Sequence, residues 1–331
     1  MEQRTLGRTG LRVAVLGFGC GSVGGLMVRG APEDQERAVA RAVELGVNYF
    51  DTAASYGNGD SESNLGRVLA ALKPSVYVGT KVGVPSTERG RIGAAIAASL
   101  EGSLQRLGRE SVDLFQLHNQ ITERGGGADF TPRRVLEEAV PALQKLQREG
   151  KTRFIGITAI GESDALHAVV GTRAIDTMQM PYNLLNPSAG SKVPAEYPAH
   201  DFKELMVHGR EADVGVIGIR VLAAGALSGE ATRHPIALPS VEPIASGSSY
   251  NVDLKRARML QPLVDEGHAG SLVEASIRYA ISHPAMSTVL IGIATPEQFE
   301  LAASAAAKGP LSAAALERVA VLQHGFVGME R

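Results

Sequence analysis

Four polar side chains lie at or just after the ends of apolar, strand-like runs between residues 51 and 118, and together they could donate, hold and orient a proton. Asp51 ends one such run, and Tyr56 lies in the loop after it. Lys81 lies at the end of the next run, and His118 at the end of the third. A phenol, an ammonium, a carboxylate and an imidazole are groups that perform general acid–base chemistry. The residue types predict a catalytic centre if the fold brings these strand ends together.

The chemistry that fits this set is hydride transfer to or from a carbonyl carbon. Reduction places negative charge on the carbonyl oxygen, and a nearby acid must supply a proton to it. Tyr56 can supply that proton, and because a free phenol has a pKa of about 10, an adjacent Lys81 ammonium would help by stabilising the phenolate. Asp51 would hold Lys81 charged, while His118 would orient the substrate oxygen.

Each of these residues also has a simpler structural explanation. Asp51 and Lys81 could form a plain buried ion pair, and Tyr56 or His118 alone could be a rim residue. Their occurrence on three successive strands favours catalysis. A Schiff-base role for Lys81 is a rival enzymatic hypothesis. The eight histidines form no H-x-H or H-E-x-x-H pair, so no metal site is predicted.

The elements that must position these groups alternate along the whole chain. Eight apolar β-rich runs are predicted as strands: Val13–Gly17, Val47–Asp51, Val76–Thr80, Val112–Leu117, Arg153–Ile157, Ile175–Gln179, Val214–Gly218 and Thr288–Ile291. Eight segments are predicted as helices: Pro32–Leu45, Ser61–Leu72, Arg91–Leu107, Pro132–Glu149, Glu162–Val170, Lys203–Glu211, Leu272–Ser282 and Pro296–Ala306. The alternation is typical of an α/β fold with parallel strands.

Eight strand–helix units without a break in composition predict a (β/α)8 TIM barrel, with residues 1–331 as a single domain. The carboxyl ends of all barrel strands open on one face, so the four polar side chains should converge there. The Gly- and Pro-rich stretches Gln120–Thr131 and Leu227–Asn251 follow strand ends on the same face. Each could be a tolerated surface insertion or a lid over the site. Pro310–Gln323 is predicted to be a last helix on the outside.

Bulk properties exclude several classes of partner. The chain has 33 Lys and Arg against 35 Asp and Glu, a net charge of −2, which gives no electrostatic footprint for nucleic acid. No apolar run approaches the roughly 18 residues of a membrane span. The single cysteine, Cys20, and an N-terminus without a signal-peptide core favour the cytoplasm. The sequence leaves the oligomeric state open.

A glycine-rich segment after the first predicted strand imitates a Rossmann loop. Gly19-Cys20-Gly21-Ser22-Val23-Gly24 matches G-x-G-x-x-G. A Rossmann loop opens directly onto a helix, yet Gly25–Ala31 intervenes before the helix signal at Pro32. We therefore expect these glycines to allow close approach of the backbone to a ligand, or to form a turn.

Two stretches carry a resemblance to the aldo-keto reductase family. Gly46–Gly66, with Phe50-Asp51-Thr52-Ala53 and Tyr56-Gly57, resembles the family's first signature. Ser103–Gly108, followed by Val112-Asp113-Leu114 and His118, resembles the second. The resemblance implies a barrel whose catalytic tetrad falls on Asp51, Tyr56, Lys81 and His118, and which binds NADPH in an extended pose.

The resemblance also implies a set of cofactor-binding residues. They are Gly19, Cys20, Gly21, Asp51, Thr158, Gln179, Ile219, Arg220, Leu222, Gly225, Leu227, Ile291, Gly292, Ile293, Thr295 and Gln298. Ala159 replaces the usual asparagine, and Ile219 stands where many members stack a tyrosine, with the planar guanidinium of Arg220 nearby. Ile293 and Ala294 fill positions that are often basic or polar. NADP(H) is therefore the predicted cofactor by family precedent, while these residues also permit NAD(H).

The predicted partner is a small-molecule carbonyl or sugar substrate, with neither nucleic acid nor membrane. An alternative from another class is a regulatory or redox-sensing protein that keeps the barrel and the cofactor but turns over slowly. Turnover over a panel of aldehydes and sugars separates the two hypotheses.

Overall fold

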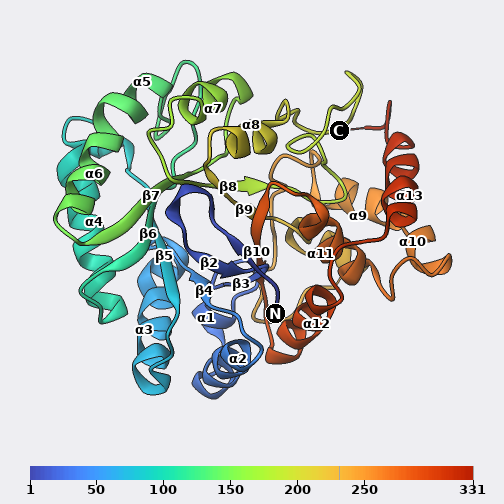
Figure 1. Ribbon diagram of the computed structural model, residues 1–331, viewed down its shortest axis with the longest axis horizontal. Helices are drawn as coiled ribbons and strands as arrows, with labels where there is room; N and C mark the ends of the chain where they lie inside the picture. The colour runs from blue at the N-terminus through green and yellow to red at the C-terminus, as the bar shows by residue number, and fades with distance from the viewer. Residues whose placement is uncertain (231, 331) are drawn as a thin grey trace.

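Eight parallel strands close into a barrel in the computed structural model, which describes residues 1–230 and 232–330. The strand order is β10-β3-β4-β5-β6-β7-β8-β9, and all neighbouring strands of the barrel are parallel (Figure 1). The strands are β3 (Leu16–Gly19), β4 (Tyr49–Asp51), β5 (Tyr77–Val82), β6 (Val112–Leu117), β7 (Thr152–Thr158), β8 (Thr177–Pro181), β9 (Gly215–Ile219) and β10 (Met286–Gly292). The predicted barrel is confirmed.

Helices form the outer ring around this barrel (Figure 1). They are α2 (Pro32–Glu44), α3 (Asp60–Leu72), α4 (Ile92–Leu107), α5 (Pro132–Arg134), α6 (Val140–Arg148), α7 (Ser163–Val170), α8 (Leu205–Glu211), α11 (Leu272–Ser282) and α12 (Pro296–Ala307). The predicted helix Pro132–Glu149 is interrupted by a π turn at Val135–Ala139. Pro141 explains the interruption, since it has no N–H to donate to the preceding turn.

The first predicted strand is wrong in one respect. The structure divides the apolar run Val13–Gly17 between β2 (Arg12–Ala14), which pairs antiparallel with β1 (Gln3–Thr5), and the barrel strand β3. The hairpin covers the amino-terminal end of the barrel, which faces the viewer in Figure 1. Its apolar residues join a buried cluster of inward-facing barrel residues: Leu6, Leu11, Val13, Tyr49, Leu114, Ile217 and Leu290. Both halves of the run are buried, so hydropathy alone could not show the break.

Further short elements lie between or outside the strand–helix units. The helices are α1 (Leu26–Arg29), α9 (Tyr250–Arg258), α10 (Pro262–Asp265) and α13 (Ala313–His324), and short 3-10 turns span Gly7–Thr9, Tyr56–Gly59, Ser86–Glu88 and Ala223–Ser228. The predicted last helix is present as α13, which lies beside α10 outside the barrel (Figure 1).

A buried ion pair fastens the stretch that follows β9. Asp253 in α9 accepts hydrogen bonds from Ser246 Oγ (2.5 Å) and from Arg256 Nη2 (2.8 Å). Arg256 also donates from Nη1 to the Pro198 carbonyl oxygen at 2.9 Å, and its side chain is fully buried. The end of the predicted insertion Leu227–Asn251 is therefore anchored to a second loop of the same barrel face. Residue 231 of that stretch lies outside the described residues.

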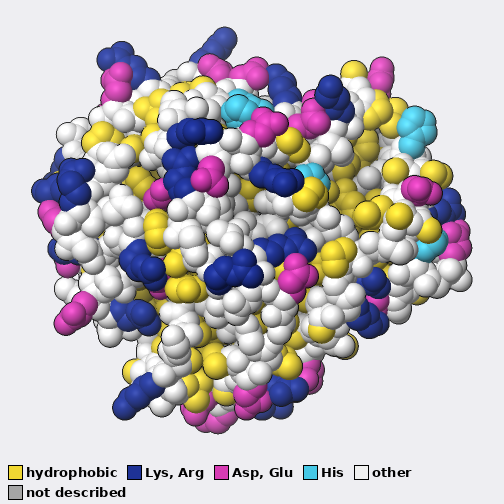
Figure 2. All heavy atoms as spheres, in the orientation of Figure 1, with side chains coloured by type: hydrophobic (Ala, Val, Ile, Leu, Met, Phe, Trp, Pro, Cys, Tyr) yellow, Lys and Arg dark blue, Asp and Glu magenta, His cyan; other side chains and the backbone are white. Residues whose placement is uncertain are grey.

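The surface carries mixed charge. Figure 2 shows basic and acidic side chains interspersed over the face seen in Figure 1, in keeping with the net charge of −2. Within residues 1–230 and 232–330, none of the helices has the length and apolar character needed to cross a membrane.

Candidate active site

The barrel brings the four predicted polar groups to the carboxyl ends of β4, β5 and β6. Asp51 is the last residue of β4, and Tyr56 opens the 3-10 turn just beyond it. Lys81 lies near the end of β5, and His118 directly follows β6. Neighbouring strands align Asp51 with Gly79 and Lys81 with Gln116, so the groups face one end of the barrel. The predicted convergence is present.

Lys81 is the centre of this cluster, with 1% of its surface exposed. Its Nζ donates to Asp51 Oδ1 at 2.5 Å, to the Thr52 carbonyl oxygen at 2.6 Å and to the Tyr56 hydroxyl at 3.2 Å. Burial lowers the pKa of Lys81, but the charge and hydrogen bonds of Asp51 and Tyr56 more than offset this, so the net pKa is raised. The Tyr56 hydroxyl therefore lies beside a fixed positive charge.

Asp51 accepts two further hydrogen bonds on its other oxygen. Tyr49 OH donates to Asp51 Oδ2 at 2.9 Å, and Gln179 Nε2 donates to the same atom at 2.6 Å. Burial raises the pKa of Asp51, and the charge of Lys81 together with these donors opposes that rise. Tyr49 is not among the predicted site residues, although its position two residues before Asp51 places both side chains on one face of the strand.

His118 lies against the ring of Tyr56. Their ring centroids are 6.0 Å apart, and the ring planes are nearly perpendicular at 85°. Burial lowers the pKa of His118 to about 3, and the positive charge of Lys81 acts in the same direction. The imidazole is therefore neutral near pH 7, so it can offer one N–H to a substrate oxygen without competing with Tyr56 as an acid.

We expect the His118 imidazole of the folded protein to show no titration between pH 5 and 8. Its folded pKa of about 3 lies below the unfolded value of 6.5. Between these values the unfolded chain binds a proton at His118 and the native state does not, so stability falls as the pH drops below 6.5. Two-dimensional ¹H–¹⁵N spectra of the ring, assigned with His118→Asn, measure this; a midpoint near 6.5 would contradict the described environment.

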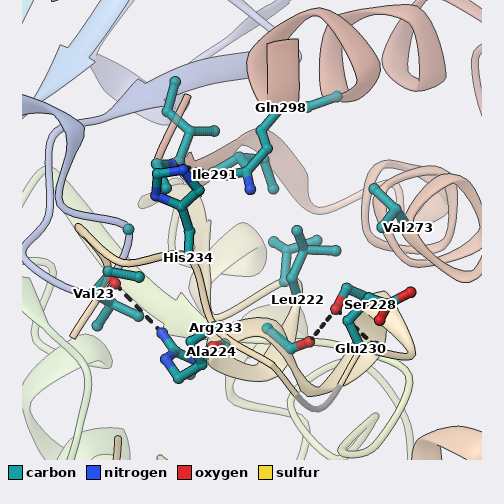
Figure 3. A pocket seen from close by; sticks show the side chains of 18 of the residues that line it. Val23, Leu222, Ala224, Ser228, Glu230, Arg233, His234, Val273, Ile291 and Gln298 are labelled. Atoms are coloured by element: carbon teal, nitrogen blue, oxygen red, sulfur yellow. Dashed lines mark hydrogen bonds between the residues drawn. The ribbon is translucent and has the colours of Figure 1, made fainter. Parts of the chain in front are cut away.

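A cavity of about 400 Å³ lies at the carboxyl ends of β9 and β10, and Asp51, Tyr56, Lys81 and His118 are not among its lining residues. It extends from Leu290, whose side chain belongs to the barrel interior, to Leu301 on α12, which is 66% exposed. Figure 3 shows Ile291 and Gln298 on one side of it and Leu222, Ala224 and Ser228 on the other. The predicted cofactor residues that line it are Arg220, Leu222, Gly225, Ile291, Gly292, Ile293 and Gln298.

The other predicted cofactor residues do not line this cavity: Gly19, Cys20, Gly21, Asp51, Thr158, Gln179, Ile219, Leu227 and Thr295. Cys20 and Leu227 have buried side chains, and Thr295 caps α12 by accepting from the Gln298 backbone N–H. Gly19 lies between Asp51 and Gly292 in the strand register, so it joins the cluster to the cavity.

Several lining residues were not predicted, and they come from the irregular stretch after β9. Arg233 donates to the carbonyl oxygens of Leu238 (2.6 Å), Ala224 (2.6 Å) and Val23 (3.4 Å), which ties three loop segments together. His234 also lines the cavity (Figure 3). The position of the stretch after a strand end was the available signal, but the sequence does not show which of its side chains turn inward.

The glycine-rich loop after β3 packs against backbone. A Cβ on Gly24 would lie 2.4 Å from the backbone nitrogen and oxygen of Ile293, so only glycine allows this contact between the two loops. β3 is a barrel strand, and only the four-residue helix α1 follows the loop, which excludes the Rossmann interpretation.

A parallel barrel that holds a phenol next to a buried ammonium at its mouth is built for acid–base chemistry. Comparison of sequences identifies its family: residues 15–323 match the model of the Aldo/keto reductase family, and the chain belongs to that family.

Known relatives agree with this assignment. L-galactose dehydrogenase of Arabidopsis thaliana is 28% identical over 309 residues, which cover 91% of this chain and 86% of the relative. L-glyceraldehyde 3-phosphate reductase of Escherichia coli K12 is 27% identical over 322 residues, with 91% and 86% covered. A solved aldo-keto reductase of Bacillus halodurans in its holo form superposes with a TM-score of 0.72 at 26% identity, over 97% of this chain and 96% of the other.

Proposed function

We propose that this aldo-keto reductase moves a hydride between a nicotinamide cofactor and an aldehyde, ketone or sugar carbonyl, with Tyr56 as the proton donor. The observation that carries the proposal is the 3.2 Å contact between the Tyr56 hydroxyl and Lys81 Nζ, with Lys81 paired to Asp51. In reduction, Tyr56 gives its proton to the developing alkoxide, and Lys81 stabilises the phenolate that remains. Neutral His118 donates a hydrogen bond that orients the substrate oxygen.

The residues around the cluster fit a nicotinamide. Thr158 Oγ1 is buried at the end of β7 and has no hydrogen-bond partner among residues 1–230 and 232–330, and Thr158 aligns with Gln179 on β8. A hydroxyl and an amide on neighbouring strands would suit the carboxamide of the cofactor, and Gln179, which donates to Asp51, would hold that group near the cluster. When bound, the reduced cofactor supplies the hydride. The cavity at the carboxyl ends of β9 and β10 suits the rest of an extended dinucleotide.

Family precedent makes NADP(H) our proposed cofactor, with weak discrimination against NAD(H). The part of the cavity beyond β10 is lined by Ile293, Ala294 and Leu301, which carry no charge. Glu297, at the start of α12, adds a negative charge and pairs with Arg37 at 3.0 Å. A 2′-phosphate is strongly anionic and gains most from Arg or Lys, so this lining provides little of that energy.

Replacing Ala294 with arginine is expected to raise the ratio of kcat/KM for NADPH to kcat/KM for NADH by about ten- to a hundredfold. A hydrogen bond to a charged group contributes roughly 1.5–3 kcal/mol, and each 1.4 kcal/mol is about tenfold. Steady-state kinetics with both cofactors measure the ratio. Ala294→Gln is the control, since it adds similar length without charge, and an equal change in both variants would argue against a charge effect.

Turnover over a panel of aldoses, hydroxyaldehydes and simple aldehydes tests the proposed function. The relatives named above act, by their names, on L-galactose and L-glyceraldehyde 3-phosphate, so aldoses and small hydroxyaldehydes come first. Substrate-dependent oxidation of the reduced cofactor is the expected result. Tight cofactor binding with no substrate-dependent oxidation would favour the regulatory or redox-sensing alternative.

We also propose that residues 1–331 act as one domain, on a small-molecule substrate and in the cytoplasm. The single cysteine, Cys20, has no partner in the chain for a disulfide and is buried next to β3, which suits a reducing compartment. The balanced charge supports neither a nucleic acid nor an anionic surface as a partner.

A further inference from the structure

Tyr49 is a buried tyrosine that points into the barrel directly beneath the candidate catalytic cluster. It has no exposed surface and packs in the interior cluster with residues of the amino-terminal hairpin. Burial places the pKa of Tyr49 well above its usual value, so its hydroxyl keeps its proton and acts as a donor. The acceptor is Asp51 Oδ2, at 2.9 Å.

The strand next to Tyr49 leaves room for this hydroxyl. Gly79 on β5 aligns with Asp51 on β4, and a Cβ at Gly79 would lie 2.4 Å from the Tyr49 hydroxyl. On the other side, a Cβ at Gly17 would lie 3.3 Å from the Tyr49 ring. Any larger residue at position 79 would push the hydroxyl away from Asp51.

The two oxygens of Asp51 consequently have different tasks. Oδ1 faces Lys81 at 2.5 Å, whereas Oδ2 accepts from Tyr49 and from Gln179. A carboxylate buried in a medium of low dielectric tends to take up a proton unless donors stabilise its charge. Gln179 is also the residue proposed to contact the nicotinamide, so its side chain is shared between Asp51 and the cofactor. Tyr49 approaches Asp51 from the interior side.

We propose that Tyr49 is a positioning residue for the reaction: its hydroxyl, in the space that Gly79 leaves, holds Asp51 ionised and aimed at Lys81, and thereby keeps the ammonium beside Tyr56. The inference rests on the proposed function of the Asp51, Lys81 and Tyr56 cluster. It adds a residue that does not touch the substrate and that acts through the carboxylate.

The first test is Tyr49→Phe, which keeps the ring and removes the hydroxyl. Kcat is expected to fall about tenfold with KM within about twofold, because the loss is a charge-assisted hydrogen bond remote from the substrate. Without this donor the carboxylate favours its protonated form, so the acidic limb of the kcat profile shifts to higher pH by about one unit. The titratable groups around Asp51 are Lys81, Tyr56, Tyr49 and Cys20, with Asp113 beyond Tyr49.

Tyr77→Phe is the matched control. Tyr77 is the partly buried tyrosine of the same interior cluster, on the neighbouring strand, and its register partner is Tyr49 rather than Asp51. Loss of its hydroxyl should leave kcat and the pH profile unchanged. Gly79→Ala is the second variant, and it should reproduce the shift of the acidic limb while Tyr49 remains in the chain.

A readout that needs no turnover is the carboxyl ¹³C resonance of Asp51 in protein labelled at aspartate, assigned with Asp51→Asn. In Tyr49→Phe its titration midpoint is expected to rise, and in Tyr77→Phe it should not move. An unchanged midpoint in folded Tyr49→Phe would overturn the inference. If the wild type reduces carbonyls and Tyr49→Phe has the same pH profile of kcat, the inference fails and the proposed function stands. If no carbonyl is reduced, the proposed function fails, and the titration of the Asp51 resonance still decides the role of Tyr49.

Discussion

Tyr56→Phe is expected to lower kcat by about 10²–10⁴-fold while the cofactor still binds. The substitution keeps the aromatic ring and removes only the hydroxyl that lies 3.2 Å from Lys81 Nζ. General acid catalysis by a positioned side chain contributes about this much, because the developing alkoxide must otherwise take its proton from water. Steady-state reduction of the best carbonyl found in the panel measures the loss.

The control for Tyr56→Phe is the affinity for the reduced cofactor. The chain has no tryptophan, so the fluorescence of the nicotinamide can be followed without interference from indole. We expect the Kd to stay within about twofold of the wild type. Full reductase turnover by this variant would show that Tyr56 is not the proton donor.

Lys81→Met is expected to lower both activity and stability. Removing one partner of a buried ion pair leaves the other charge uncompensated, at a cost of roughly 3–5 kcal/mol. In this site the stranded charge is Asp51, which is 3% exposed. Kcat should fall by about 10²-fold or more, because the phenolate of Tyr56 loses its positive neighbour. Urea unfolding and steady-state kinetics measure the two effects.

The double variant Asp51→Asn with Lys81→Met separates these effects. An amide in place of the carboxylate removes the unpaired charge, so stability should recover by a large part of the loss. Activity should stay as low as in Lys81→Met, because the ammonium beside Tyr56 is still missing. Recovery of activity along with stability would mean that Lys81 has only a structural role.

The sequence predicted the parts of the fold that depend on periodic patterns. The predicted carboxyl ends of two strands, Asp51 and Leu117, agree with the structure to the residue, since polar loop residues follow the apolar run there. Helix starts at Pro32 and Pro296 were also correct, because proline suits the first turn. These elements suffice to bring Asp51, Lys81 and His118 to one end of the barrel.

What the sequence could not predict depends on tertiary contacts. The hairpin of β1 and β2 covers the barrel end, yet Val13 and Ala14 of β2 are buried and continue the apolar run that leads into β3. The start of α8 at Leu205 is set by positive φ angles at Lys203 and Glu204, which propensity does not show. Tyr49 looked like any apolar strand residue, because its role depends on the space at Gly79 of the next strand.

Transfer of deuterium from a reduced cofactor labelled at the nicotinamide C4 hydride to the carbonyl substrate tests the central claim most directly. A hydride that moves between the cofactor and the substrate at the Tyr56 site should leave one deuterium on the carbinol carbon of the product, as seen by mass spectrometry and NMR. In Tyr56→Phe the same label should transfer at a rate about 10²–10⁴-fold lower. If the wild-type protein formed the alcohol product without deuterium on that carbon, the result would contradict hydride transfer from the cofactor.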